Sequence, residues 1–152
     1  KRQDVYKGTG SKESWEKITL ASTIGGMVIN TAGVTLAHGM EHPASGLKDI
    51  VHGKGLAALT PTIIEASYQG APEKFAKLAK LFGGEKAEDL AGKVRELLED
   101  IELTCTLSDL GIEEKDIPWM AENCMKVSAP SIANNPVVFS QEEIAEIYKK
   151  AL

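Results

Sequence analysis

The chain has 152 residues, of which 17 are basic and 22 are acidic, so its formal net charge at pH 7 is −5. This length fits one ordinary domain, and hydrophobic and charged shares of 43% and 26% are normal for a globular protein. The acidic balance, with no cluster of Lys and Arg, excludes a nucleic-acid binder, because phosphate contacts need clustered cations. Aromatic residues make up only 5%, which favours an aliphatic, Ala-rich core of packed helices over a β-sandwich.

Two features of the chain bear on its organisation and compartment. Its two cysteines, Cys105 and Cys124, cannot form a disulfide framework, so a reducing cytoplasm is the expected location. The chain begins with Lys1 rather than Met and has no apolar signal segment, so we expect a piece of a longer protein. We expect residues 1–14 to form an N-terminal arm or loop and residues 15–152 to form one domain.

The first predicted helix starts near Glu13, with Ser11 or Ser14 as its N-cap, and breaks near Gly33. Residues 18–40 carry no fully charged side chain, and a membrane-spanning helix needs about 20 apolar residues. Several threonines, together with Gly25, Gly26 and Gly33, make this run too polar to face lipid. We therefore expect a helix buried within protein, where small residues let neighbouring backbones approach, and no membrane partner.

Helical periodicity continues along the rest of the chain. A second helix over residues 35–42 is expected to stop at Pro43, because a residue before proline avoids the helical region, and residues 44–51 then form a loop. Ser140 and Glu143 form a capping box at the start of the last helix. No segment alternates apolar and polar residues with period two, so the predicted fold is all-α, with six to eight helices and no sheet. The remaining helices are predicted over residues 52–68, 72–82, 87–103, 113–127 and 141–151, with 128–136 irregular.

All three histidines, His38, His42 and His52, lie within one stretch of fifteen residues. His38 and His42 are four residues apart, so on a helix their imidazoles share one face. The Pro-Ser-Gly segment after His42 could fold His52 back to the same place. Imidazole is a common ligand of zinc and iron, so the cluster predicts a shared metal site. The alternative is that one or more of these residues are ordinary core or surface histidines.

The segment from His38 to Gly46, His-Gly-Met-Glu-His-Pro-Ala-Ser-Gly, closely resembles the iron-containing (group III) alcohol dehydrogenases. The resemblance includes Val51-His52-Gly53, which follows ten residues after the histidine pair and opens a helix with Pro61 in it. Weaker matches follow in the right order to the end of the chain, at residues 110–112, 116–117, 135–136, 143–144 and 147–148. This family places the motif in a helical, bundle-like C-terminal domain with the dehydroquinate-synthase-like fold.

The resemblance also implies roles for the three histidines. His38 and His52 correspond to metal ligands, for Fe²⁺ or Zn²⁺, so that residues 15–152 form a metal-binding domain. His42 corresponds to a residue that does not bind the metal but lies near the nicotinamide, as the catalytic and cofactor-binding residue. Two further family ligands, an Asp and a His four residues apart, come earlier in the family's chain and are not found here.

The function implied is the metal- and substrate-binding half of an NAD(P)-dependent dehydrogenase that interconverts alcohols and aldehydes or ketones. NAD or NADP would be bound mainly by an N-terminal nucleotide-binding domain that this sequence lacks, so the chain alone is expected to be inactive. Its partners would be a small alcohol or aldehyde, that missing domain and, in a homodimer, a second copy.

Two other interpretations stay open. His38-Gly-Met-Glu41-His42 also fits the His-x-x-Glu-His pattern of zinc metallopeptidases, with Glu41 as general base, although the expected stop at Pro43 speaks against it. The chain could also be a non-catalytic helical interaction domain.

Overall fold

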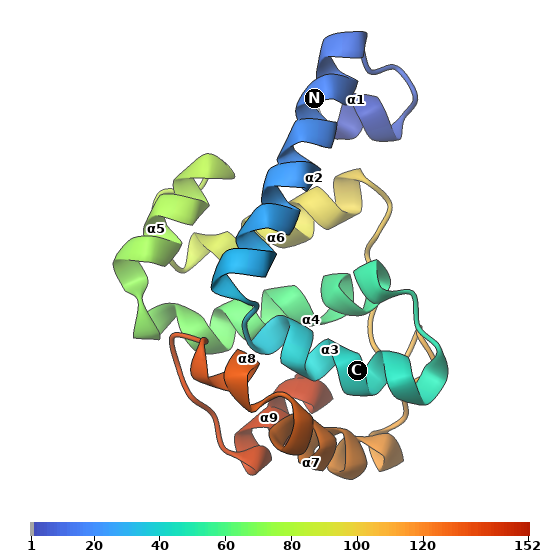
Figure 1. The fold of residues 1–152 in the computed structure, drawn as a ribbon, viewed down its shortest axis with the longest axis vertical. Coiled ribbons are helices and arrows are strands. Elements are labelled where there is room, and N and C mark those ends of the chain that lie inside the picture. The colour runs from blue at the N-terminus through green and yellow to red at the C-terminus, as the bar shows by residue number, and fades with distance from the viewer. Residues whose placement is uncertain (1) are drawn as a thin grey trace. The chain divides into compact units, whose positions relative to one another are not determined.

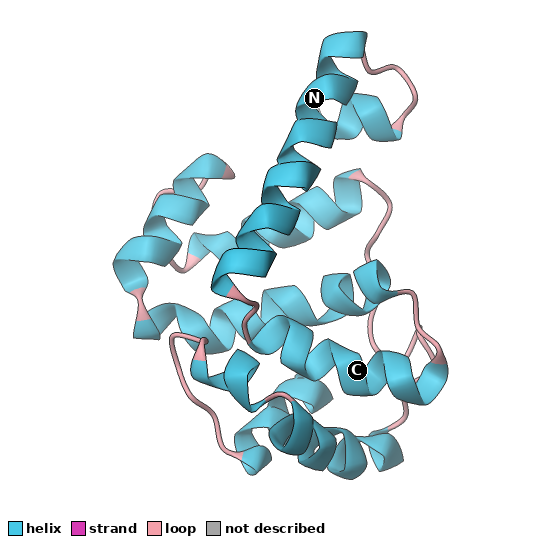
Figure 2. Ribbon diagram, in the orientation of Figure 1, coloured by secondary structure: helices cyan, strands magenta, loops and turns pink. Residues whose placement is uncertain are grey.

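Helices and their connections make up residues 2–152, which are the residues that the computed structural model describes, and no strand occurs within this range (Figures 1 and 2). The prediction of an all-α fold is therefore confirmed. The described range contains nine α-helices, more than the six to eight expected, because two short helices of five residues each, α1 and α8, were not anticipated. The chain divides into two units, one ending at Gly33 and the other spanning Val34–Leu152.

The first unit contains α1 (Arg2–Tyr6) and α2 (Lys12–Ala32). Residues 2–6, within the segment expected to be an arm or loop, form the short helix α1, and residue 1 lies outside the described residues. Helix α2 itself was well predicted. The Ser11 hydroxyl caps it by accepting a hydrogen bond from the backbone N–H of Ser14, and Gly33 ends it with a φ of 71°, which suits glycine.

The prediction that this first long helix is buried is wrong for this chain. Only Ser14 of α2 is buried, and neither Gly25 nor Gly26 has a neighbour within 4 Å of a built Cβ atom. The other helix of this unit, α1, has five residues and is too short to cover a 21-residue partner. The large apolar side chains of α2 that stay exposed are Trp15, Leu20, Ile24, Met27, Val28 and Ile29.

The membrane test gives a limited result. No single helix in the described chain is long and apolar enough to cross a membrane. Helices α2 and α3 meet the criterion of length and composition only when they are taken together across the break between them.

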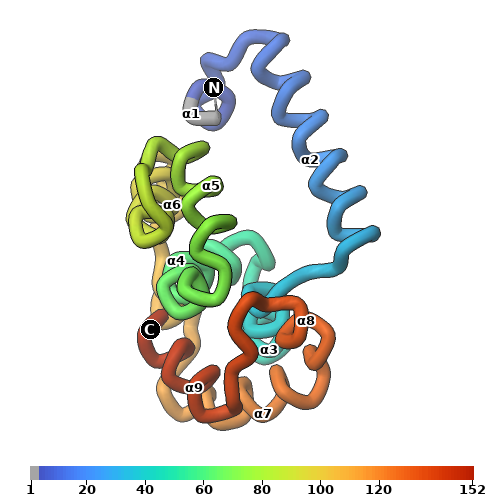
Figure 3. Tube along the Cα trace, turned by 90° about the vertical axis from the view of Figure 1, so that its left-hand side faces the viewer, coloured from blue at the N-terminus to red at the C-terminus, as the bar shows by residue number. Residues whose placement is uncertain are grey.

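The second unit contains the remaining helices. Helix α3 packs against α4, α7 and α8, while α4 also packs against α6 and α9, so α3 and α4 form the centre of this unit (Figure 3). Tyr148 of α9 is fully buried and donates a hydrogen bond from its hydroxyl to the backbone oxygen of Met40, which ties α9 to the middle of α3. The bounds are α3 (Leu36–Lys48), α4 (His52–Ser67), η1 (Tyr68–Gly70), α5 (Pro72–Leu81), α6 (Asp89–Asp100), η2 (Glu114–Asp116), α7 (Ile117–Val127), α8 (Ala129–Ala133) and α9 (Gln141–Lys150).

Pro43 does not stop α3, which is a correction to the sequence prediction. The helix runs through the proline to Lys48, so most of the expected loop over residues 44–51 is helical. Pro43 has no N–H to donate to the carbonyl of Gly39, four residues earlier. The buried Ser128 hydroxyl donates to that carbonyl instead, at 3.2 Å, and compensates for the missing backbone bond.

The other boundaries differ less from prediction. The segment 128–136 is not wholly irregular, because Ala129–Ala133 forms α8, which packs on α3. The capping box of the last helix is confirmed: Glu143 N–H is bonded to the Ser140 hydroxyl, and the Glu143 carboxylate accepts from the Ser140 N–H.

Candidate metal centre

The three histidines come from two packed helices. His38 and His42 lie one turn apart on α3, and His52 is the first residue of α4. The chain reverses between the helices at Asp49, whose φ of 53° and ψ of 43° end α3 in the left-handed conformation. The structure thus brings together all three histidines that the sequence singled out.

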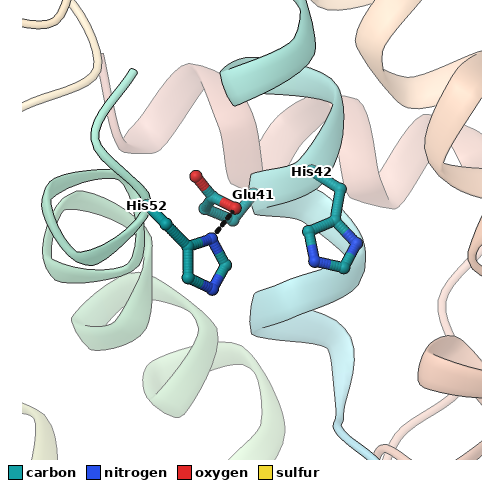
Figure 4. A group of neighbouring side chains, drawn as sticks. All are labelled: Glu41, His42 and His52. Carbon is teal, nitrogen blue, oxygen red and sulfur yellow. Dashed lines mark hydrogen bonds and ion pairs between the residues drawn. The ribbon is translucent and has the colours of Figure 1, made fainter. Parts of the chain in front are cut away.

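The imidazole rings form a close group. Ring centroids are 5.2 Å apart for His38 and His52, 5.7 Å for His42 and His52, and 6.1 Å for His38 and His42. The planes of His42 and His52 are only 24° from parallel, and Figure 4 shows these two rings side by side, one from each helix.

Glu41 is the member of the group that sequence reasoning did not place correctly. Its side chain has 0% exposure, and one carboxylate oxygen, Oε2, is hydrogen-bonded to Nδ1 of His52 (Figure 4). The other oxygen, Oε1, accepts a hydrogen bond from the hydroxyl of Ser45. Ser45 lies one turn after Glu41, so this contact depends on the continuation of α3 through Pro43.

The electrostatic environment favours a neutral His38. Burial is the largest cause that lowers the pKa of His38, and electrostatic repulsion between a protonated His38 and its neighbours His52 and His42 lowers it further, while the Glu41 carboxylate raises it. A neutral imidazole is the form that binds a metal, so His38 keeps a lone pair at neutral pH.

The donor set fits a metal ion of the zinc or iron type. Two imidazoles that share one tetrahedral ion through bonds of about 2.0–2.1 Å bring their centroids to about 5 Å from each other. The 5.2 Å separation of His38 and His52 agrees with this value. A second grouping is also compact, because one ligand atom from each of Glu41, His42 and His52 lies within 4.8 Å of the others.

These two groupings differ in which histidine accompanies His52. Glu41 is a poor direct ligand in the present arrangement, because both its oxygens are already hydrogen-bonded and the side chain is buried. Without Glu41 the second grouping is reduced to two imidazoles whose centroids lie farther apart than those of His38 and His52. Of these two pairs of imidazoles, His38 and His52 have the closer ring centroids.

The burial and hydrogen bonding of Glu41 also speak against the peptidase interpretation. A general base must reach a water molecule, whereas Glu41 has no exposed surface and its oxygens are held by Ser45 and His52. Helix α3 continues through Pro43, so it is the burial of Glu41, and not a helix stop, that speaks against a peptidase.

A separate cavity of about 550 Å³ contains none of the histidines. Residues of α4 and α6 line it, together with Cys105 and the end of α9. Its Arg95 is already paired with Glu65 at 2.6 Å, and we assign no chemistry to this cavity.

Comparison with known proteins decides the family. Residues 2–152 match the profile of the Fe-containing alcohol dehydrogenase family, C-terminal part. The chain belongs to the iron-containing alcohol dehydrogenases. This confirms the resemblance that the histidine motif suggested.

Relatives and solved structures of this family agree along almost the whole chain. The 1,3-propanediol dehydrogenase of Klebsiella pneumoniae is 34% identical over 99% of this chain and 40% of its own length. Lactaldehyde reductase of Escherichia coli is 27% identical over 93% of this chain and 39% of its own length. The crystal structure of a 1,3-propanediol oxidoreductase aligns with a TM-score of 0.86 at 35% identity, over 99% of this chain and 41% of that chain.

The chain thus spans about 40% of the length of these curated relatives. The helical fold of the family's C-terminal part is the fold observed here, as the alcohol dehydrogenase of Oenococcus oeni also shows, with a TM-score of 0.87 over 98% of this chain.

Proposed function

We propose that this chain is the metal- and substrate-binding helical half of an NAD(P)-dependent alcohol dehydrogenase that interconverts alcohols and aldehydes or ketones. The observation that carries the proposal is the meeting of His38, His42 and His52 between α3 and α4 in a member of the iron-containing family. A cytoplasmic location is part of the proposal, because both cysteines are free thiols.

The histidines divide the work in this proposal. His38 and His52 bind the metal, Fe²⁺ or Zn²⁺, together with ligands from outside this chain. His42, one turn from His38 on α3, faces the same space and orients the nicotinamide and the reacting carbon. When bound, the metal supplies Lewis-acid chemistry that favours loss of the hydroxyl proton, and the nicotinamide accepts or returns the hydride.

A further part of the protein is needed for this activity. The chain contains no nucleotide-binding domain of its own and covers about 40% of its relatives, so we propose that such a domain precedes it in the intact protein. The exposed apolar side chains of α2 support this, because an uncovered apolar helix face of this kind marks a contact surface. The intact protein is also proposed to form a homodimer.

The test is an aldehyde-reduction assay with the intact protein, loaded with Fe²⁺ or Zn²⁺ and followed by the absorbance of NADH or NADPH. We expect turnover that is lost on chelation and restored by metal, and no turnover by the 152-residue chain alone. Peptide hydrolysis without alcohol or aldehyde turnover would overturn the proposal, as would full dehydrogenase activity of the isolated chain.

A further inference from the structure

We propose that Glu41 is a positioning residue for His52: its carboxylate holds Nδ1 of the imidazole and leaves Nε2 to bind the metal. This inference rests on the proposed function, because it assigns a purpose to a buried carboxylate within the proposed metal site.

The first support is the completeness of the hydrogen bonding around Glu41. A carboxylate with 0% exposure is costly to bury without hydrogen bonds, and here each oxygen lies within hydrogen-bond distance of a side chain, Oε2 of His52 Nδ1 and Oε1 of the Ser45 hydroxyl. The Ser45 hydroxyl also lies 3.0 Å from the backbone oxygen of Ile50, so its one proton serves either Glu41 or Ile50 at a given moment. This second contact anchors Ser45 to the turn between α3 and α4.

The second support is the space that Gly55 leaves for the carboxylate. A Cβ atom at this position would lie 2.7 Å from Oε1 and 2.8 Å from Cγ of Glu41, which real Cβ atoms do not tolerate. His52 and Gly55 are three residues apart and therefore share one face of α4. One face of α4 thus carries the His52 imidazole and the space at Gly55 that the Glu41 carboxylate fills. Glu41 and Ser45 lie together on one face of α3.

The chemistry of imidazole explains why such a partner is useful. A neutral imidazole carries its proton on either nitrogen, and only the other nitrogen can bind a metal. An acceptor at Nδ1 selects the form with the proton there, fixes the ring orientation and raises the basicity of Nε2. Removal of such a partner typically lowers metal affinity by about 10–100-fold.

The experiment measures Zn²⁺ affinity of the intact apoprotein by competition with a chromophoric chelator, without any assay of turnover. We expect Glu41→Gln to weaken Zn²⁺ binding by about 10–100-fold. The matched control is Glu65→Gln, since Glu65 is an exposed glutamate of α4 that pairs with Arg95, and it should bind Zn²⁺ as the wild type does. The ¹⁵N chemical shifts of His52 provide a second readout: one tautomer, protonated at Nδ1, in the wild type and a mixture in Glu41→Gln.

A glycine pair keeps the test informative if Glu41→Gln fails to fold. Gly55→Ala pushes on the Glu41 carboxylate and should weaken Zn²⁺ binding, whereas Gly53→Ala, with nothing within 4 Å of its Cβ, should not. Wild-type affinity and a single His52 tautomer in both Glu41→Gln and Gly55→Ala would overturn the proposal. Loss of Zn²⁺ as complete as in His52→Ala would overturn it too, since Glu41 would then be a ligand. If the wild-type protein binds no metal, the proposed function fails first.

Discussion

The hydrogen bond between Ser128 and Gly39 is the contact that lets α3 continue through Pro43, and its contribution to the free energy of unfolding can be measured directly. Ser128 is 4% exposed, and its hydroxyl lies 3.2 Å from the Gly39 carbonyl. Ser128→Ala would leave that buried acceptor without a donor, so we expect the free energy of unfolding to fall by about 1–3 kcal/mol. The measurement is urea unfolding followed by circular dichroism, with the m-value checked for constancy.

A double-mutant cycle tests whether the Ser128 hydroxyl replaces the backbone N–H that Pro43 lacks. Pro43→Ala restores a backbone N–H that can donate to the Gly39 carbonyl, so in this background Ser128→Ala should cost less than about 1 kcal/mol. Ser108→Ala, at an exposed serine, serves as the control and should change stability by no more than about 0.5 kcal/mol. An equal cost of Ser128→Ala with and without Pro43 would refute the reasoning, since the hydroxyl would then not be replacing the missing amide.

Two further predictions concern buried groups. Burial raises the pKa of the Cys124 thiol to about 11, so only roughly a thousandth of this thiol is ionised at pH 8. We therefore expect iodoacetamide to modify the half-buried Cys105 first, and to modify Cys124 only when urea unfolds the chain. Peptide mapping by mass spectrometry checks this order, which equal labelling of the native chain would contradict. Tyr148→Phe removes the donor to the Met40 carbonyl and should lower the free energy of unfolding by about 1 kcal/mol, measured in urea; an unchanged midpoint would show that this bond contributes nothing.

The sequence predicted those features whose causes are local. The caps of α2 and α9 depend on residues within one turn of each helix start, Ser11 in one case and Ser140 with Glu143 in the other. The grouping of the histidines was also predictable, because helical spacing and a short connection constrain where His52 can lie.

The features that the sequence did not predict depend on contacts between distant segments. Pro43 is tolerated because Ser128, far along the chain, supplies the missing donor. The burial of Glu41 needs Gly55 and His52 of another helix, so its residue type alone gave no sign of the role proposed here. The apolar side chains of α2 are exposed because the other helix of its unit, α1, is too short to cover them. The periodicity of apolar residues shows that a helix has an apolar face, but not which segment covers that face.

The most direct test of the central claim is the metal content of three purified variants of the intact protein, measured by atomic emission beside the wild type. We predict that His38→Ala and His52→Ala lose the metal, because each removes one of about four ligands. His42→Ala should keep most of the metal but lose turnover, since its proposed place is beside the nicotinamide. If His42→Ala loses metal as fully as His38→Ala, the division of roles is wrong; if all three variants keep both metal and activity, the histidine group is not the metal centre.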